Sequence, residues 1–257
     1  MTVLLVVAKA PVPGRVKTRL CPPLTPTDAA EVAAAALLDT LDAVRAVPGA
    51  VPVLAYAGRL ADAVRGAELR AALTGWTLLP QRGRGLGERL AAAHADAGAV
   101  APGRPVLQLG MDTPQVRPEL LTAALAGSAE TEAVLGPAVD GGWWALGLRD
   151  PGAAVVLRDV PMSTPATGRL TRAALTGRGL RVAALPELAD VDEWPAALAV
   201  AAAAPDGRFA DVVRRLAARP PLGPEPVGRS AAGPEPDVRL AAGAKRVVPP
   251  VGSRGGR

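Results

Sequence analysis

The sequence predicts an α/β protein, a three-layer α/β/α sandwich with a mostly parallel central sheet. Two observations support this fold class. Short apolar runs rich in Val and Leu recur through the first 218 of the 257 residues, as in the buried strands of parallel sheets. Ala-rich stretches long enough for helices lie between most of these runs. Strands that alternate with helices are typically joined by right-handed crossovers, which build a parallel sheet.

The expected strands are Val3 to Ala8, Val51 to Ala57, Trp76 to Leu79, Val106 to Leu109, Ala133 to Leu135, Trp143 to Leu148 and Leu180 to Leu185. Helices are expected over residues 29–47, 59–72, 86–98, 117–127, 166–177 and 193–218. Thr25 to Asp28 carries Pro and cap residues ahead of the first helix, a common helix start.

One domain is expected over residues 1–218, followed by a tail over 219–257. The tail is rich in Pro, Gly and Ala and has little apolar surface to bury, so we expect it to be disordered. It holds seven Lys and Arg against three Asp and Glu, which accounts for +4 of the net charge of +5. The remaining body is nearly neutral. This balance argues against nucleic-acid binding, which requires a continuous basic face.

Composition also bears on the compartment. No apolar run approaches the roughly 20 residues that cross a bilayer, and the first residues lack the basic region and cleavage site of a signal peptide. Cys21 is the single cysteine, so an intrachain disulfide is excluded, which fits a reducing environment. We therefore expect a cytoplasmic protein without a membrane span. The sequence does not indicate an oligomeric state.

Asp112 follows the apolar run Val106 to Leu109 and is held between Gly110 and Pro114. In open α/β sheets, ligands bind beyond the carboxyl ends of the strands, where such a carboxylate could hold a divalent cation. Alternatively, Asp112 or Thr113 could cap the helix expected at 117–127. Both interpretations remain open at this stage.

The loop after the first strand is strongly basic. Pro11, Pro13 and Gly14 prevent a helix, and three cations, Arg15, Lys17 and Arg19, follow at alternate positions. The loop matches neither the phosphate-loop motif nor the dinucleotide-binding glycine motif. It therefore indicates either a different kind of anion site or a solvated loop.

The sequence resembles the DUF2064 family, often described as arsenosugar-biosynthesis-type glycosyltransferases of the GT-A and nucleotidyltransferase-like superfamily. Five ordered segments carry the resemblance: Ala8 to Leu20, Gln81 to Leu90, Gly110 to Pro114, Val134 to Trp144 and Leu188 to Asp192. Two departures concern aromatic positions. Trp143 and Trp144 stand where tyrosines are usual, and Met162 stands where tryptophan is usual.

The resemblance implies a GT-A or nucleotide-diphospho-sugar-transferase-like fold and a set of site residues. Asp112 would be the strand-end metal aspartate, and Asp192 a second ligand for Mg²⁺ or Mn²⁺, with Asp190 as a competing candidate. A helix cap is the alternative for Asp190 and Asp192. The resemblance also implies nucleotide-binding residues: Ala8, Lys9, Arg15, Lys17, Arg19, Gln81, Gly85 and Gly87. Among these, Lys17 would stabilise the leaving phosphate and thus act in catalysis.

Asp140 precedes Gly141 and Gly142, where backbone can approach a ligand closely. We expect Asp140 to be the general base, although Asp-Gly is also a common turn. The only histidine, His94, has no second His or Cys for a zinc site and no G-x-S-x-G motif for a hydrolase, so a packing or surface role is expected.

These residues support three functional hypotheses. The first is a metal-dependent glycosyltransferase that moves a sugar from a nucleotide diphosphate sugar to a small-molecule acceptor. The second is a nucleotidyltransferase that joins a nucleoside triphosphate to a phosphorylated small molecule and releases pyrophosphate, because the three cations of the first loop could hold a triphosphate. The third is a non-catalytic nucleotide-binding protein.

Overall fold

The computed structural model describes residues 1–219, except for the side chains of residues 128 and 129. The expected disordered tail lies, apart from Arg219, outside the described residues. The boundary between domain and tail therefore stays a prediction.

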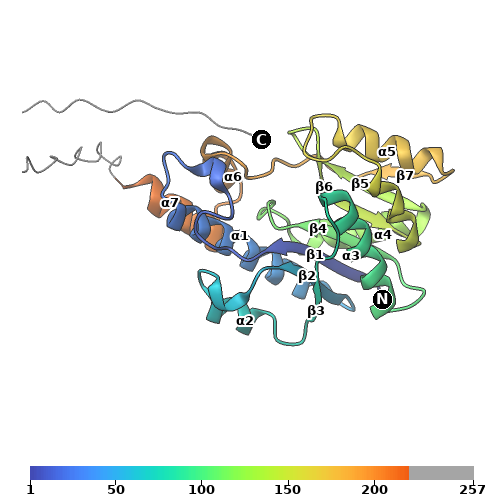
Figure 1. Ribbon diagram of the computed structural model, residues 1–257, viewed down its shortest axis with the longest axis horizontal. Coiled ribbons are helices and arrows are strands. Elements are labelled where there is room, and N and C mark those ends of the chain that lie inside the picture. The colour runs from blue at the N-terminus through green and yellow to red at the C-terminus, as the bar shows by residue number, and fades with distance from the viewer. Residues whose placement is uncertain (220–257) are drawn as a thin grey trace, which may run out of the picture. The chain divides into compact units, whose positions relative to one another are not determined.

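Within the described residues the centre of the fold is a seven-stranded sheet (Figure 1). Its strands are β1 (Val3–Lys9), β2 (Val51–Ala57), β3 (Thr77–Pro80), β4 (Val106–Gly110), β5 (Ala133–Pro137), β6 (Trp143–Leu148) and β7 (Val182–Ala184). The spatial order is β3-β2-β1-β4-β6-β5-β7. Only β6 runs antiparallel to its two neighbours, β4 and β5. The expected α/β class and mostly parallel sheet are confirmed.

The strand order reverses between β1 and β4. From β1 the chain builds outward through β2 and β3, whereas β4 starts the other half of the sheet. β1 and β4 pair in parallel with Val7 opposite Gly110, so both strands end at the same edge. The connections that leave the two ends diverge, and such a switch point leaves a crevice where ligands bind in open α/β sheets.

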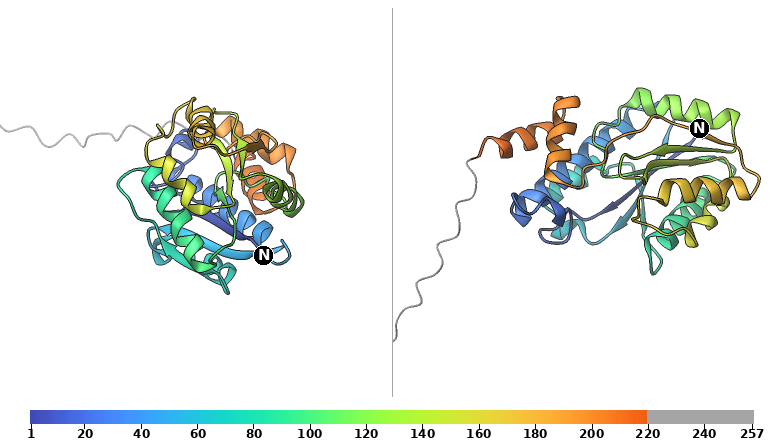
Figure 2. Two further views of the ribbon diagram at one scale, coloured as in Figure 1. Left: turned by 90° about the vertical axis from the view of Figure 1, so that its right-hand side faces the viewer. Right: turned by 90° about the horizontal axis from the view of Figure 1, so that it is seen from above.

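Helices cover both faces of the sheet (Figure 2). They are α1 (Pro26–Arg45), α2 (Gly66–Ala72), α3 (Leu86–Val100), α4 (Pro118–Glu130), α5 (Thr167–Gly177), α6 (Trp194–Ala203) and α7 (Arg208–Ala217). One face of β1, through Leu4 and Val6, packs in the cluster that includes α1 and α4. The opposite face, through Val3 and Leu5, packs against α3. This alternation explains why the central strands are apolar at most positions.

Three short 3₁₀ helices complete the order: η1 (Thr18–Leu20), η2 (Leu60–Asp62) and η3 (Pro151–Arg158). The sequence did not indicate η3, whose buried Ala154 and Leu157 pack with Leu90 of α3 and Leu175 of α5. The helix expected over 59–72 was wrong in its first half, where η2 precedes the short α2.

The single helix expected over 193–218 was also wrong, because α6 and α7 are separate helices. The chain breaks at Pro205, Asp206 and Gly207, and Gly207 has a φ of +110° that only glycine adopts readily. Asp39 of α1 then accepts hydrogen bonds from the backbone N–H groups of Arg208 (3.1 Å) and Phe209 (2.8 Å). A distant side chain therefore caps α7, which the local sequence does not reveal.

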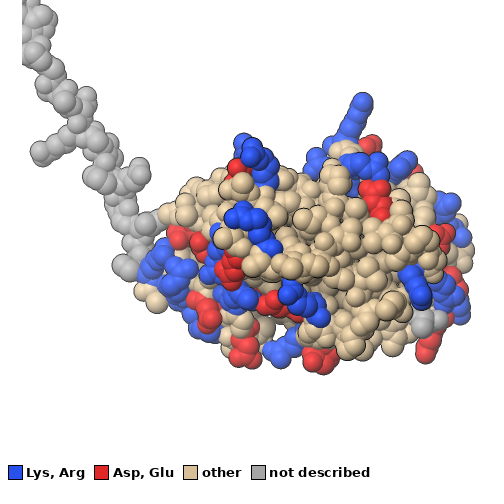
Figure 3. Space-filling view, turned by 90° about the horizontal axis from the view of Figure 1, so that it is seen from below, with Lys and Arg blue, Asp and Glu red and all other residues tan. Residues whose placement is uncertain are grey.

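None of the described helices is long and apolar enough to cross a membrane. On the face shown in Figure 3, Lys and Arg side chains are interspersed with Asp and Glu. That face therefore carries no continuous basic surface of the kind that a nucleic-acid backbone requires.

Candidate active site

A two-lobed cleft lies at the edge of the sheet where β1 and β4 end. The basic lobe, with a volume of about 760 Å³, is lined by Lys9, Arg15, Lys17, Arg19, Arg89 and Gln81, among others. The acidic lobe, about 250 Å³, is lined by Asp190, Gln108, Trp143 and Trp144, among others. Both lobes share Asp112, Asp140 and Asp192. A ligand in one lobe can therefore reach a ligand in the other at these carboxylates.

The carboxylates of Asp112 and Asp192 converge on the ammonium of Lys17. Lys17 Nζ lies 2.6 Å from Asp112 Oδ1 and 2.9 Å from Asp192 Oδ1. The Lys17 side chain is only 6% exposed, and Arg19 adds a contact of 3.2 Å to the other oxygen of Asp192. The family resemblance implies that Asp112 and Asp192 lie close together as ligands of one cation, and their shared contact with Lys17 shows that they do lie close together; their role as metal ligands stays a prediction.

Backbone pairing holds the two aspartates together. The N–H of Val191 donates to the carbonyl of Asp112 at 2.9 Å, and the side-chain amide of Gln115 donates to the carbonyl of Ala189. The segment before α6 is thereby fixed across the end of β4. Hydrogen bonds to the main chain therefore hold Asp192 beside Asp112, although the two residues are far apart in the sequence.

Neither aspartate caps a helix, which was the alternative interpretation. The N-cap of α4 is Arg117 and that of α6 is Glu193, and neither cap makes a side-chain hydrogen bond. Asp112, Asp190 and Asp192 thus precede the helices but do not cap them. Their side chains line the cleft instead.

Lys17 has an unusual backbone conformation. Its φ of +50° puts it in the left-handed region, uncommon for a residue with a side chain, and the flanking Val16 and Leu20 are buried. Burial opposes the ammonium charge, but the attraction of Asp112 and Asp192 outweighs it and raises the pKa of Lys17. Backbone strain that persists at such a position is typical of functional sites.

The acidic residues differ in their electrostatics. Burial acts to raise the pKa of Asp192, but Lys17 and Arg19 outweigh it, so that this pKa lies below the ordinary value. Asp190 has no cation at salt-bridge distance among the described residues: burial, followed by the charges of Asp140 and Asp192, raises its pKa, and the more distant Lys17 only partly opposes this. Asp190 and Asp140 therefore form the side of the cleft that is not neutralised by close cations.

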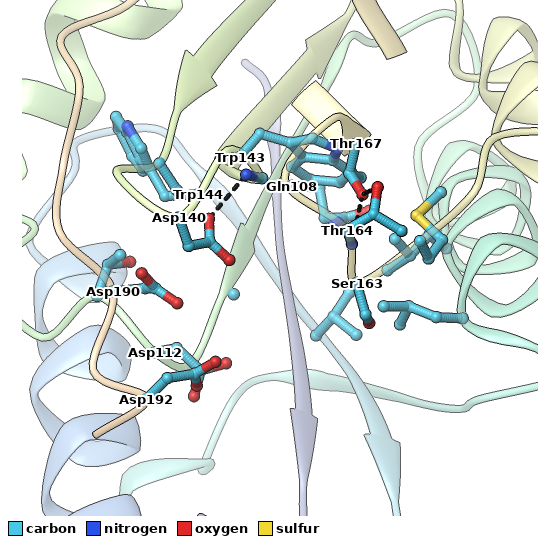
Figure 4. Close-up of a pocket in the computed structure, with 18 residues that line it drawn as sticks. Gln108, Asp112, Asp140, Trp143, Trp144, Ser163, Thr164, Thr167, Asp190 and Asp192 are labelled. Atoms are coloured by element: carbon cyan, nitrogen blue, oxygen red, sulfur yellow. Dashed lines mark hydrogen bonds between the residues drawn. The ribbon is translucent and has the colours of Figure 1, made fainter. Parts of the chain in front are cut away.

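Asp140 sits in a tight turn that faces both lobes (Figure 4). Its Oδ1 accepts a 2.7 Å hydrogen bond from the N–H of Gly142. Gly141 has a φ of +87°, and a Cβ there would lie 2.1 Å from the carbonyl oxygen of Pro165. The turn interpretation is thus correct, yet one carboxylate oxygen has no role in the turn and can serve the cleft.

The residues predicted to bind nucleotide divide into two groups. Six of them line the basic lobe: Ala8, Lys9, Arg15, Lys17, Arg19 and Gln81. Gln81 donates its amide protons to the carbonyls of Ala8 (2.9 Å) and Ala55 (3.0 Å), so only its oxygen remains to accept from a ligand. Gly85 and Gly87 line neither lobe, and a Cβ on Gly87 would lie 2.1 Å from the carbonyl oxygen of Leu157 in η3.

A divalent cation fits the carboxylates only with help from a ligand. Asp112 and Asp192 supply two hard oxygen donors that converge on one point, as Mg²⁺ and Mn²⁺ require. Among the described residues, however, no group of three or more His, Cys, Asp and Glu side chains could hold a metal. The remaining ligands would have to be water and the phosphates of a nucleotide, an arrangement that is usual for Mg²⁺.

His94 is not at this site. It is fully buried in α3, and neither ring nitrogen has a hydrogen-bond partner among the described residues. Burial lowers its pKa to about 3, and the smaller effect of the neighbouring Gln108 acts in the opposite direction. The expected packing role is consistent with this environment.

Sequence reasoning missed several residues of the cleft. Gln108 lies inside β4 and reads as part of an apolar run, while Ser163, Thr164 and Thr167 come from a loop and helix start without a recognised motif. Arg89 falls on a helix expected for packing. The polar Gln108 between Leu107 and Leu109 was the one available signal, because a polar residue in a central strand is unusual.

The cleft lies at a strand-order switch point, the place where open α/β sheets bind their ligands. The sequence profile of DUF2064, described as an uncharacterized protein conserved in bacteria, matches residues 40–164. The resemblance to this family is confirmed over that span. The span contains three of the five motif segments; those at 8–20 and 188–192 lie outside it.

Among solved structures, the chain is similar to a candidate nucleotide-diphospho-sugar transferase from Desulfovibrio desulfuricans G20. The two share 25% identity with a TM-score of 0.75, over 85% of this chain and 96% of the other. This likeness confirms the predicted fold and the transferase class. No curated protein gives a significant sequence match.

Two weaker similarities carry no argument about function. One is to CMP:2-keto-3-deoxy-manno-octonic acid synthetase complexed with CTP, at 14% identity and a TM-score of 0.49, over 79% of this chain and 98% of the other. The other is to Rv0371c of Mycobacterium tuberculosis H37Rv in complex with manganese, at 22% identity and a TM-score of 0.46, over 76% and 96%.

Proposed function

We propose that the protein is a metal-dependent glycosyltransferase that moves a sugar from a nucleotide diphosphate sugar to a small-molecule acceptor. The observation that carries the proposal is the contact between a basic and an acidic lobe at Asp112. A diphosphate is an anion and fits the basic lobe, whereas the group to be transferred would extend into the acidic lobe. The similarity to a candidate nucleotide-diphospho-sugar transferase supports this arrangement.

The cations would act on the leaving group. Lys17 is buried, where a charge acts more strongly than in water, whereas Arg15 and Arg19 are exposed, and Arg19 also contacts Asp192. Asp112 and Asp192 would hold Mg²⁺ or Mn²⁺, which supplies Lewis-acid stabilisation of the diphosphate when bound. Stabilising the charge that develops on a departing phosphate is commonly the largest catalytic contribution.

Asp140 would be the general base. It lies in the wall shared by the two lobes, and its turn with Gly142 fixes its direction. A carboxylate near the acceptor hydroxyl can take its proton during an inverting transfer. Asp190 is the neighbour that can influence this proton transfer, because its own pKa responds to the charge of Asp140.

A nucleotidyltransferase is the second candidate. The basic lobe, with three cations in its first loop and Arg89 beside them, has enough positive charge for a triphosphate. A non-catalytic nucleotide-binding protein is the third, but such a protein would not need converging carboxylates beside a candidate base.

The product distinguishes these functions. We would incubate the protein with Mn²⁺ and either nucleotide sugars or nucleoside triphosphates, together with a mixture of small acceptors. Release of a nucleoside diphosphate supports glycosyl transfer, and release of pyrophosphate supports nucleotidyl transfer. Asp112→Asn is the control, because it keeps the size of the side chain and removes its charge. Binding without turnover in any combination would leave the non-catalytic interpretation.

A further inference from the structure

We infer that Ser163 is a further substrate-binding residue, and that its hydroxyl binds a hydroxyl of the transferred sugar where the two lobes of the cleft meet. This role rests on the proposed function, because it assigns a contact to the sugar of a nucleotide diphosphate sugar. The place of Ser163 in the cleft, its unpartnered hydroxyl and its backbone conformation support the assignment.

Ser163 lies where the two lobes meet. It lines both of them, together with Thr164. The three aspartates that the lobes share lie on one side of the pocket, and Ser163 and Thr164 lie on the other (Figure 4). A diphosphate in the basic lobe and a sugar that extends into the acidic lobe would be joined between these two sides. Ser163 is therefore placed beside the part of the sugar that is next to the diphosphate.

The hydroxyl of Ser163 is free to bind a ligand. Thr164 Oγ1 lies 3.2 Å from Thr167 Oγ1, whereas Ser163 Oγ makes no hydrogen bond among the described residues. Ser163 is exposed, and its side chain points away from Thr164 and Thr167 in Figure 4. A serine hydroxyl both donates and accepts, as a sugar hydroxyl does, so the two can pair in either direction.

Ser163 also has an unusual backbone conformation. Its φ of +58° lies in the left-handed region. Three residues other than glycine have a positive φ in the described part of the chain, and two of them, Lys17 and Ser163, line the cleft. Such conformations are unfavourable and persist where the surrounding structure enforces them, commonly at functional sites. Glycine would adopt this conformation without a steric penalty, yet the chain has a serine here.

The loop around Ser163 is held by another hydroxyl. Thr167 Oγ1 accepts a hydrogen bond from the N–H of Thr164 at 3.0 Å and donates to the carbonyl of Pro161 at 2.9 Å. These two bonds tie the segments on either side of Ser163 to the start of α5. Ser163 is thus fixed by its neighbours, while its own hydroxyl takes no part in holding the loop.

The same loop is joined to the turn of Asp140. The N–H of Gly168 donates to the carbonyl of Gly141 at 2.8 Å. The carbonyl oxygen of Pro165 lies against Gly141, where a Cβ would be only 2.1 Å from it. Because the loop and the turn form one wall, a sugar that binds Ser163 would be held in a fixed position relative to the proposed base.

Calorimetry on the full chain with Mg²⁺ tests this role. The probes are the glucose conjugates of UDP, GDP, ADP, CDP and dTDP, each paired with its free nucleoside diphosphate. Ser163→Ala should weaken the nucleotide sugar that binds most tightly by roughly three- to tenfold, the effect of one neutral hydrogen bond, and leave its nucleoside diphosphate unchanged. Equal nucleotide-sugar binding in wild type and variant would overturn the inference. An equal loss for the nucleoside diphosphate would also overturn it, because the hydroxyl would then contact a phosphate.

Ser163→Gly separates ligand binding from structure. It removes the hydroxyl and suits the positive φ, so the melting temperature should hold or rise while nucleotide-sugar binding falls. Thr167→Val is the matched control, because it removes a hydroxyl that has hydrogen-bond partners and should lower the melting temperature. If both Ser163 variants lose as much thermal stability as Thr167→Val, the Ser163 hydroxyl serves the loop and the inference is wrong.

Monodeoxy forms of the same nucleotide sugar identify the partner hydroxyl. The form that lacks this hydroxyl should bind the wild type less tightly and should lose nothing further in Ser163→Ala. Losses that add for every monodeoxy form would contradict the inference. Turnover is a separate readout: if the wild type releases a nucleoside diphosphate but Ser163→Ala binds the nucleotide sugar as tightly, the proposed function stands and this contact fails. If no nucleotide sugar binds the wild type, both fail.

Discussion

The ammonium of Lys17 lies 2.6 Å from Oδ1 of Asp112, and the same ammonium contacts Asp192. The residue predicted to bind phosphate and the residues predicted to bind metal are therefore in direct contact. In this state Lys17 supplies the positive charge between the two carboxylates. A nucleotide that draws Lys17 toward its phosphates would leave the carboxylates in need of another cation, which couples nucleotide and metal binding.

Replacement of Lys17 by alanine should expose this coupling. Without the ammonium, the two carboxylates face each other without a cation between them. We expect a loss of about 1–3 kcal/mol of unfolding free energy. This is less than the cost of breaking a fully buried ion pair, because both aspartates are over 40% exposed. Mn²⁺ alone should then raise the melting temperature more than in the wild type, while nucleoside diphosphate binding weakens. Thermal shift and calorimetry measure both effects.

Two variants serve as controls for Lys17. Lys9→Ala removes an exposed cation of the same lobe and should alter neither stability nor the response to Mn²⁺. Lys17→Arg keeps the charge but changes its reach and geometry, so binding should partly survive while turnover falls further. Nucleotide affinity unchanged in a folded Lys17→Ala protein would remove the first loop from the active site.

The sequence predicted the edges of this site better than its interior. Strand ends were legible because apolar runs stop at Lys9 and Gly110, and these ends fixed where Asp112 would lie. The left-handed backbone of Lys17 and the hydrogen bond from Val191 to Asp112 involve no local signal. Both are consequences of how distant segments pack, which propensity and periodicity do not encode.

The same distinction explains the errors in the helices. Glycine at position 207 is compatible with a helix break. The new helix start after it is stabilised by Asp39, which lies far away in the sequence and caps α7. Gln108 was overlooked for a different reason. The other residues of β4 are apolar or glycine, so the segment has the pattern of a core strand. Whether such a polar residue belongs to a site or to the core can be decided only when the structure shows its hydrogen-bond partners.

A cap across the fold should make Asp39 important for stability. Asp39→Ala removes the acceptors of the Arg208 and Phe209 N–H groups, with an expected loss of about 1–2 kcal/mol. Asp42→Ala is the matched control, because Asp42 is over half exposed and its ion pair among the described residues is with the Arg208 side chain, an exposed pair worth a few tenths of a kcal/mol. Urea unfolding of both variants measures the difference. Equal losses would mean that the cap is not the main contribution.

His94 should make the protein sensitive to acid. Its pKa of about 3 in the folded state lies below the roughly 6.5 of an unfolded chain, so the unfolded state binds the proton first. The stabilisation is complete above pH 6.5 and is lost as the pH falls toward 3, at up to about 1.4 kcal/mol per pH unit.

The variant His94→Leu isolates this effect. It removes the titrating group and two unpartnered nitrogens, so its stability near neutral pH should hold or rise. The difference in unfolding free energy between wild type and variant should grow in favour of the variant from pH 6.5 to 4. A difference that stays constant over this range would show that His94 binds protons equally in the folded and unfolded states, so that burial does not lower its pKa.

Asp140→Asn tests the proposed base without disturbing the turn. The asparagine oxygen can still accept the hydrogen bond from Gly142, so the melting temperature should stay within a degree or two of wild type. The amide cannot take a proton, and kcat should fall by roughly 10² to 10⁴ with little change in KM. Asp140→Ala also loses the hydrogen bond from Gly142. The difference in melting temperature between Asp140→Ala and Asp140→Asn would therefore measure the contribution of this hydrogen bond to stability.

The pH dependence distinguishes a base from a neighbour. If Asp140 is the base, the pH profile of the residual activity of Asp140→Asn should differ from that of the wild type. The variant should also lower the pKa of Asp190, because the charge of Asp140 contributes to raising it. If Asp140→Asn keeps full activity with the wild-type pH profile, Asp140 serves only the turn, and Asp190 becomes the carboxylate to examine as the proton acceptor.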